Sequence, residues 1–218
     1  MFSLVSLISA DEAARADLGA GLQALGGVAA PVLEGNFNGG DLAARFAFPD
    51  EPAYRAARPA IDAVIAAAQA SQHNWAFFQD GASGVTAPGL ADGVWRGLLL
   101  CADRSHAEAL QDQFEAEMVL MPKYIPAIRN WRFSRALESG GELAWTHVWE
   151  QEYADLGGLM GPYMLHPYHW ASIDRWFDPE YPEFLVDPAL MPMSSPRMLI
   201  NGPPLLPGLM SASVCNQS

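Results

Sequence analysis

The sequence predicts an α+β protein built from two similar halves, each with the order strand, helix, strand, strand, helix. Three observations predict this class. Short alternating or apolar runs are bounded by turn residues, longer runs have helical spacing, and the same order of elements occurs twice. Because the chain has 218 residues, each half is long enough to bury a core of its own.

The first half contains five expected elements. In order they are strand, helix, strand, strand and helix over 2–8, 11–25, 31–37, 41–48 and 51–70. Two glycines at 26 and 27 end the first helix. The run Asn-Gly-Gly at 38–40 is a hairpin signal between the second and third strands.

The second half repeats this order of elements. Strand, helix, strand, strand and helix are expected over 94–102, 105–125, 128–137, 142–153 and 163–177. Ser105 is expected to cap the helix that it precedes. The run Ser-Gly-Gly at 139–141 turns the chain between two strands, and Pro167 fits the first turn of the last helix, where its missing N–H costs nothing.

Two such units can place two antiparallel sheets face to face and form an α+β barrel within one chain. The prediction divides the chain into a first repeat, a linker rich in Gly and Ala, a second repeat and a proline-rich tail, over 1–70, 71–93, 94–187 and 188–218. The prolines of the tail argue against regular helix or central strand, so we expect it to wrap the surface or cover a pocket.

Composition and charge exclude several classes of protein. Half of the residues are hydrophobic and 17% are charged, which is typical of a globular chain. The formal charge of −13 repels nucleic acid and anionic lipid surfaces, so neither is expected as a partner. No apolar run reaches the length of a membrane span, and the two cysteines, Cys101 and Cys215, are too few for a disulfide framework. A cytoplasmic protein is expected.

Three of the five histidines fall in one stretch of 23 residues that also contains many aromatic side chains. Period-two alternation in the strand over 142–153 places four residues on one face: Trp145, His147, Trp149 and Gln151. A neutral imidazole is the natural base near pH 7, and a tyrosine hydroxyl can stabilise a developing oxyanion. Tyr163 and His169 form such a pair if the turn between them brings the two side chains together.

The segments 145–150 (WTHVWE) and 163–169 (YMLHPYH) resemble the stress responsive A/B barrel (Dabb) family, and in particular its plant polyketide cyclases. The resemblance implies ferredoxin-like units that form a dimeric α+β barrel. It implies that Tyr163 and His169 are a catalytic dyad and that His147 lines the pocket.

The first half departs from this motif. Aligning the prolines of 54–61 (YRAARPAI) and 163–169 puts Arg58 and Ile61 opposite His166 and His169, so the first half lacks the base.

A structural role stays open for each of these residues. His147 fits a core position as well as a pocket, and His166, which precedes a proline, is more typical of a helix-entry residue. Most of the aromatic residues must be core, but some can line a cavity for a flat aromatic ligand. The residues expected to contact substrate are Trp145, Trp149, His166, Trp170, Trp131 and Tyr124. Asp174 and Arg175 are interpreted as a salt-bridged helix end.

The leading hypothesis is a cofactor-independent lyase that removes a proton from a small phenolic or other aromatic compound in aromatic catabolism. A lignin-derived substrate that loses formaldehyde is the specific form of this hypothesis. A polyketide cyclase or isomerase is an alternative, and so is a non-catalytic stress or assembly barrel. A metal or haem site using His147, Glu150, His166 or His169 lacks the usual ligand spacing. No cofactor or metal is therefore expected, and a homodimer is left open.

Overall fold

The computed structural model describes residues 1–33, 40–90, 92–189 and 191–195, which form a mixed α/β structure around one antiparallel, nearly closed sheet. The elements of the first half are β1 (Phe2–Ser9), α1 (Glu12–Ala24), β2 (Val28–Pro31), β3 (Leu42–Phe48), α2 (Glu51–Ala67) and β4 (Gln72–Gln79). The rest are β5 (Ala82–Val85), β6 (Val94–Leu100), α3 (Glu108–Tyr124), β7 (Asn130–Gly140), β8 (His147–Tyr153), α4 (Leu156–Gly158), η1 (Leu159–Tyr163), η2 (His169–Ile173), η3 (Asp174–Trp176) and β9 (Met191–Ser195).

The strand order shows two ferredoxin-like units within one sheet. It runs β2-β3-β1-β4-β7-β8-β6-β9, so each half has its four strands in the same relative order and the halves meet at β4 and β7. The backbone N–H of Leu33 donates to the carbonyl of Ser194 at 2.8 Å, which links the two ends of the sheet. The duplicated fold expected from the sequence is confirmed.

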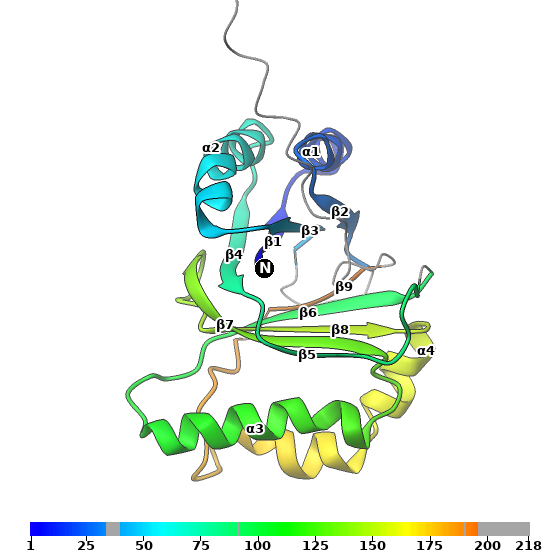
Figure 1. The fold of residues 1–218 in the computed structure, drawn as a ribbon, viewed down its shortest axis with the longest axis vertical. Helices are drawn as coiled ribbons and strands as arrows, with labels where there is room; N and C mark the ends of the chain where they lie inside the picture. The colour runs from blue at the N-terminus through cyan, green and yellow to red at the C-terminus, as the bar shows by residue number, and fades with distance from the viewer. Residues whose placement is uncertain (34–39, 91, 190, 196–218) are drawn as a thin grey trace, which may run out of the picture.

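Helices cover the two outer faces of this barrel. Figure 1 shows α1 and α2 at one end, α3 with the short helices η1 to η3 at the other, and the strands between them. The Asp50 side chain accepts a hydrogen bond from the N–H of Ala53 at 2.8 Å and so starts α2. Tyr54, Ile61 and Phe77 belong to the apolar core beneath α1 and α2.

A buried ion pair crosses the barrel interior between the halves. Arg45 of β3 donates to Glu150 of β8 at 2.9 Å, and both side chains are buried. The indole N–H of Trp95 donates to the same carboxylate oxygen at 3.3 Å. Breaking this pair would leave an uncompensated buried charge, so the contact favours the observed arrangement of β3 and β8.

The linker expected over 71–93 is wrong in part. It contains β4, the fourth strand of the first unit, and β5, which pairs with β7. Phe77 and Phe78 of β4 are fully buried, because β4 lies in the sheet between β1 and β7. Pairing with two strands that are distant in the sequence makes 72–79 a central strand, and the local sequence does not reveal this pairing.

The proline-rich tail contains an unexpected strand. Residues 191–195 form β9 and pair with β6 at the end of the strand order. Within this ladder Pro192 lies opposite Leu98. The remainder of the expected tail, 196–218, lies outside the described residues, as does most of the strand expected over 31–37.

Three further expectations about the second half need correction. α3 begins at Glu108 after Ala107, and Ser105 instead donates its N–H to the Asp103 carboxylate in a turn. β8 begins at His147, later than expected, because 141–146 do not form strand. The helix expected over 163–177 is divided into short π and 3₁₀ turns, with Pro167 between η1 and η2.

Candidate active site

The candidate site lies between the sheet of the second half and its helices. His147, Trp149, Gln151 and Tyr153 alternate along β8, and all four are buried. Trp149 and Tyr153 pack in one apolar cluster with Phe114 of α3. The expected alternation holds for these four residues. Trp145 is the exception, because it precedes β8 and packs with Val5 and Trp95 in the core between the two halves.

Tyr163 and His169 lie together in this layer. Their ring centroids are 4.9 Å apart and the rings meet edge to face. Tyr163 is 2% exposed. The His169 side chain is 14% exposed and therefore reaches solvent. The turn between them is closed by hydrogen bonds from the backbone N–H groups of His166 and His169 to the carbonyls of Tyr163 and His166.

Arg96 of β6 holds the Tyr163 hydroxyl. Its Nη1 donates to the Tyr163 hydroxyl at 3.0 Å and to Oε1 of Gln151 at 2.9 Å. The guanidinium carbon lies 5.0 Å from the centroid of the Tyr163 ring. A hydroxyl that accepts from a cation in a buried layer is well placed to stabilise negative charge on a bound oxygen.

Burial and neighbouring charges set the protonation of His169. Burial lowers the pKa of His169 to about 4, and electrostatic interactions with Arg96 and His166 act in the same direction. The imidazole is therefore neutral at pH 7. Its Nδ1 lies 3.5 Å from Oδ1 of Asp174, and no hydrogen bond reaches this buried nitrogen from the described residues.

Asp174 is a site residue that the sequence reading assigned to a different role. Burial, with the nearby Asp178, raises the pKa of Asp174 to about 6, so it is a carboxylate at pH 7. The salt-bridged helix end expected for Asp174 and Arg175 is wrong for this pair, because Arg175 instead donates to Glu117 of α3 at 2.6 Å. Asp174 therefore faces His169.

The structure places His147 in a separate environment. One ring nitrogen lies 2.9 Å from the Thr146 hydroxyl and the other 3.0 Å from a Glu115 oxygen. Its ring stacks on Phe133 at 5.3 Å. Because both nitrogens are engaged, His147 does not offer the free nitrogen that a general base needs, and the role expected for it beside Tyr163 and His169 does not fit this geometry.

The residues expected to contact substrate are spread over several environments. Trp170 is 57% exposed and meets His169 edge to face at 5.8 Å. His166 accepts a hydrogen bond from the backbone N–H of Tyr168 and so stabilises the turn. Tyr124 is half exposed and stacks on Tyr168, whereas Trp131 packs on the buried Trp149. Only Trp170 and His166 lie close to the pair.

Three polar residues around the pair were not predicted as site residues: Arg96, Gln151 and Tyr153. Arg96 alternates with Leu98 and Leu100 on the face of β6 that packs under the helices. A lone cation in the apolar phase of a strand was the signal that could have found it. Gln151 and Tyr153 lie on the predicted face of β8, but their chemistry depends on Arg96.

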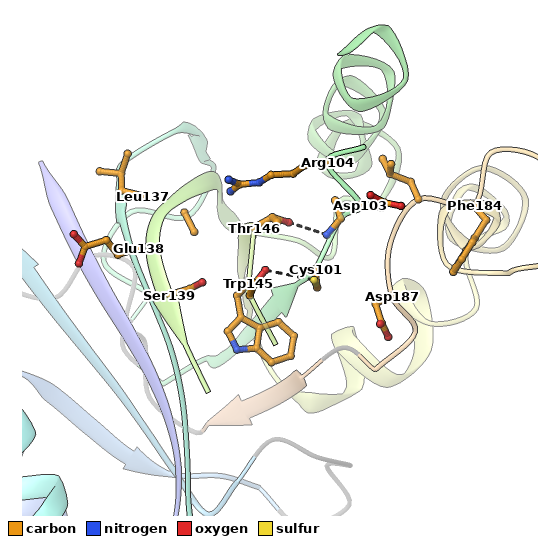
Figure 2. Close-up of a pocket in the computed structure, with 14 residues that line it drawn as sticks. Cys101, Asp103, Arg104, Leu137, Glu138, Ser139, Trp145, Thr146, Phe184 and Asp187 are labelled. Atoms are coloured by element: carbon orange, nitrogen blue, oxygen red, sulfur yellow. Dashed lines mark hydrogen bonds between the residues drawn. The ribbon is translucent and has the colours of Figure 1, made fainter. Parts of the chain in front are cut away.

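Two open clefts lie elsewhere on the surface. Figure 2 shows the first, of about 590 Å³, with Glu138 and Asp187 on opposite sides and Trp145 between them. The second, of about 550 Å³, is lined by residues that include Glu115 and Arg135. Neither cleft is lined by Tyr163 or His169, so these two clefts lie apart from the candidate acid/base pair.

The four residues of the metal hypothesis do not form one site. Glu150 faces Arg45 in the barrel interior, whereas His147 faces Glu115 on the opposite side of β8. Within the part of the chain that the structure describes, no group of three or more His, Cys, Asp or Glu could hold a metal ion. Among the described helices, none is both long and apolar enough to cross a membrane.

Residues 98–186 match the family model of the stress responsive A/B barrel domain. This segment belongs to that family. The match covers α3, β7 and β8 and includes Tyr163 and His169. The resemblance expected from the two sequence segments is confirmed over these residues, and no curated protein matches the chain.

Solved structures of similar fold cover both halves. An anthrone oxidase-like protein has a TM-score of 0.64 at 8% identity, covering 89% of this chain and 90% of its own. A mutant chlorite dismutase from Candidatus Nitrospira defluvii has a TM-score of 0.55 at 8% identity, with the same coverage. A major regulator of staphylococcal pathogenesis has a TM-score of 0.50 at 6% identity, covering 90% and 99%. At these identities, the likeness shows the fold alone.

Proposed function

We propose that this protein is a cofactor-independent enzyme that transfers a proton on a small aromatic compound, with lyase chemistry as its reaction class. One observation carries the proposal. A neutral, partly accessible imidazole lies edge to face against a buried tyrosine whose hydroxyl is held by an arginine. A base beside an oxyanion site is the arrangement that removal of a proton next to a phenol or carbonyl needs.

In this proposal His169 takes the proton and Tyr163 faces the oxygen on which negative charge develops. Asp174 lies on the Nδ1 side of the ring. A carboxylate there favours the tautomer with hydrogen on Nδ1 and leaves Nε2 free to accept a proton. Tyr163 can donate its hydroxyl hydrogen to the substrate oxygen because its own oxygen already accepts from Arg96. For release of formaldehyde, His169 takes the hydroxyl proton of a hydroxymethyl group and the C–C bond to that group breaks. Its electron pair moves toward the oxygen that faces Tyr163, and His169 then returns the proton to the carbon that lost the group.

Hydrogen exchange tests the proton transfer without knowledge of the final product. Phenols and aryl ketones are incubated with the protein in D₂O, and deuterium incorporation and any released aldehyde are followed by NMR. We expect exchange with the wild-type protein and a loss of roughly 10²-fold or more with His169→Gln. Exchange that persists at the wild-type rate in this variant contradicts the proposal. A cyclised product from an open-chain polyketide substrate would instead favour the cyclase alternative.

A further inference from the structure

Arg96 is a partly exposed cation beside a buried layer, and none of its described hydrogen-bond partners is an anion. Its described partners are the neutral oxygens of Tyr163 and Gln151, and no described carboxylate forms an ion pair with it. Arg45 and Arg175 differ, because each donates to a glutamate. Arg96 is only partly exposed, and a guanidinium that is largely withdrawn from water is normally paired with an anion because an uncompensated charge there is costly.

Two further polar groups beside Arg96 have no hydrogen-bond partner among the described residues. They are Nε2 of Gln151 and the hydroxyl of Tyr153, and both side chains are fully buried. Gln151 binds Arg96 through its other amide atom, and the Tyr153 ring meets that of Tyr163 at 5.6 Å. Both groups can donate a hydrogen bond.

Burial raises the pKa of Tyr153 well above 10, so its hydroxyl stays protonated. Native proteins satisfy most buried donors, so two orphans beside an unpaired cation indicate a ligand.

We propose that Arg96, Gln151 and Tyr153 bind the carboxylate of the substrate, which is therefore an aromatic carboxylic acid. The inference rests on the proposed function, because it names the substrate class of the same site. A guanidinium suits a carboxylate since its planar N–H groups match the two oxygens. Arg96 is partly exposed, so an anion can reach it from solvent. With the carboxylate on Arg96, the aromatic ring lies toward His169 and Tyr163.

Binding of an acid and its neutral amide tests this inference without turnover. The probes are 4-hydroxybenzoate and 4-hydroxybenzamide, which have nearly the same shape, and their Kd values are measured by tryptophan fluorescence and by the rise in Tm. We expect the wild-type protein to prefer the acid by roughly 10- to 100-fold. Arg96→Gln should remove this preference and leave the Kd for the amide nearly unchanged.

Two further variants keep the test decisive if Arg96→Gln fails to fold. Tyr153→Phe and Gln151→Met should each weaken binding of the acid by roughly 3- to 10-fold. Neither should lower the Tm of the free protein by more than a few degrees, because each removes a group without a described partner. Arg104→Gln is the matched control, since Arg104 lines the cleft of Figure 2 and not this layer.

The inference is overturned if the wild-type protein does not prefer the acid. It is also overturned if Arg104→Gln rather than Arg96→Gln removes the preference, or if Tyr153→Phe and Gln151→Met leave it intact. His169→Gln separates this inference from the proposed function. Preference for the acid with unchanged hydrogen exchange in His169→Gln would keep the binding site and reject the catalytic assignment.

Discussion

Each half of the molecule contains a buried tyrosine whose hydroxyl is held by an arginine, but the surroundings of the two pairs differ. In the first half, Arg58 donates to the Tyr54 hydroxyl at 2.9 Å and also to Asp62 at 2.7 Å. Arg58 stacks on Trp75, and Tyr54 stacks on Phe77 with 3.6 Å between ring centroids. Both of these hydrogen bonds lie within α2, and the two stacking contacts pack α2 against β4.

In the second half, Arg96 holds Tyr163 with no described carboxylate beside it, and orphaned donors of Gln151 and Tyr153 lie nearby. The comparison teaches that a Tyr–Arg pair alone does not indicate a site. Satisfied partners indicate a structural role, whereas unsatisfied donors around an unpaired cation indicate a ligand.

The largest expected difference between the two halves is the effect on turnover of replacing His169. His169→Gln should lower turnover by roughly 10²-fold or more, because a positioned acid/base group contributes that much. Steady-state kinetics measure this loss of turnover, with the compound that shows hydrogen exchange in D₂O as the substrate. Ile61→Val is the control from the first half, expected to cost about 0.5–1.5 kcal/mol of stability and to leave activity per molecule unchanged. An unfolded His169→Gln protein, or one with normal turnover, would make the histidine structural.

Removing each tyrosine hydroxyl sharpens the comparison directly. Tyr163→Phe should lower turnover by roughly 10- to 100-fold, less than the histidine change, because one donor to the oxyanion is lost. Tyr54→Phe should leave turnover unchanged and lower the free energy of unfolding by about 0.5–1.5 kcal/mol, since the hydrogen bond from Arg58 and the long one to Glu138 are lost. Kinetics and urea unfolding of both variants measure this, and equal effects on turnover would remove the distinction between the halves.

The pH dependence of stability should involve one histidine from each half. Burial lowers the pKa of His73 and of His169 to about 4, with Arg58 and Arg96 acting in the same direction. Between pH 6.5 and 4, the unfolded chain binds these protons and the folded chain does not, so the free energy of unfolding falls as pH falls. Each histidine contributes on the order of 1–3 kcal/mol to this loss.

Asp174 opposes this trend because its raised pKa, about 6, makes the folded chain bind a proton first. Urea unfolding at pH 7 and pH 4.5 should therefore show a smaller loss of stability in His73→Gln and His169→Gln than in the wild-type protein. Asp174→Asn should show a larger loss. The assigned pKa directions are wrong if all three variants lose the same free energy as the wild-type protein.

The smallest effect is expected on removal of metal ions. Because the proposed reaction needs proton transfer alone, protein dialysed against a chelator should keep its full turnover and its preference for the acid over the amide. Metal analysis and kinetics before and after dialysis measure this. Activity that disappears and then returns with one particular divalent ion would favour a metal-dependent mechanism.

Much of the fold was predictable because its elements are local. The buried residues of β8 follow a period of two, and Asp50 sits where a cap is needed for α2. β4 was not predictable in the same way. Its sequence at 72–79 mixes polar residues with Trp75, Phe77 and Phe78, and its place between β1 and β7 depends on pairing with distant strands. The helix expected over 163–177 is instead divided into short turns, with Pro167 between η1 and η2.

The sequence by itself determined that the chain contains two similar repeats, most of their helices and strands but not β4, β5 and β9, and the motif that contains Tyr163 and His169. Tertiary structure alone decided which groups surround that pair. Arg96 reaches Tyr163 across 67 positions in the chain, and Asp174, rather than His147, faces His169. The physical reason is that strand register and helix packing set these contacts. Both depend on the free energy of the whole folded core, which a short stretch of sequence does not determine.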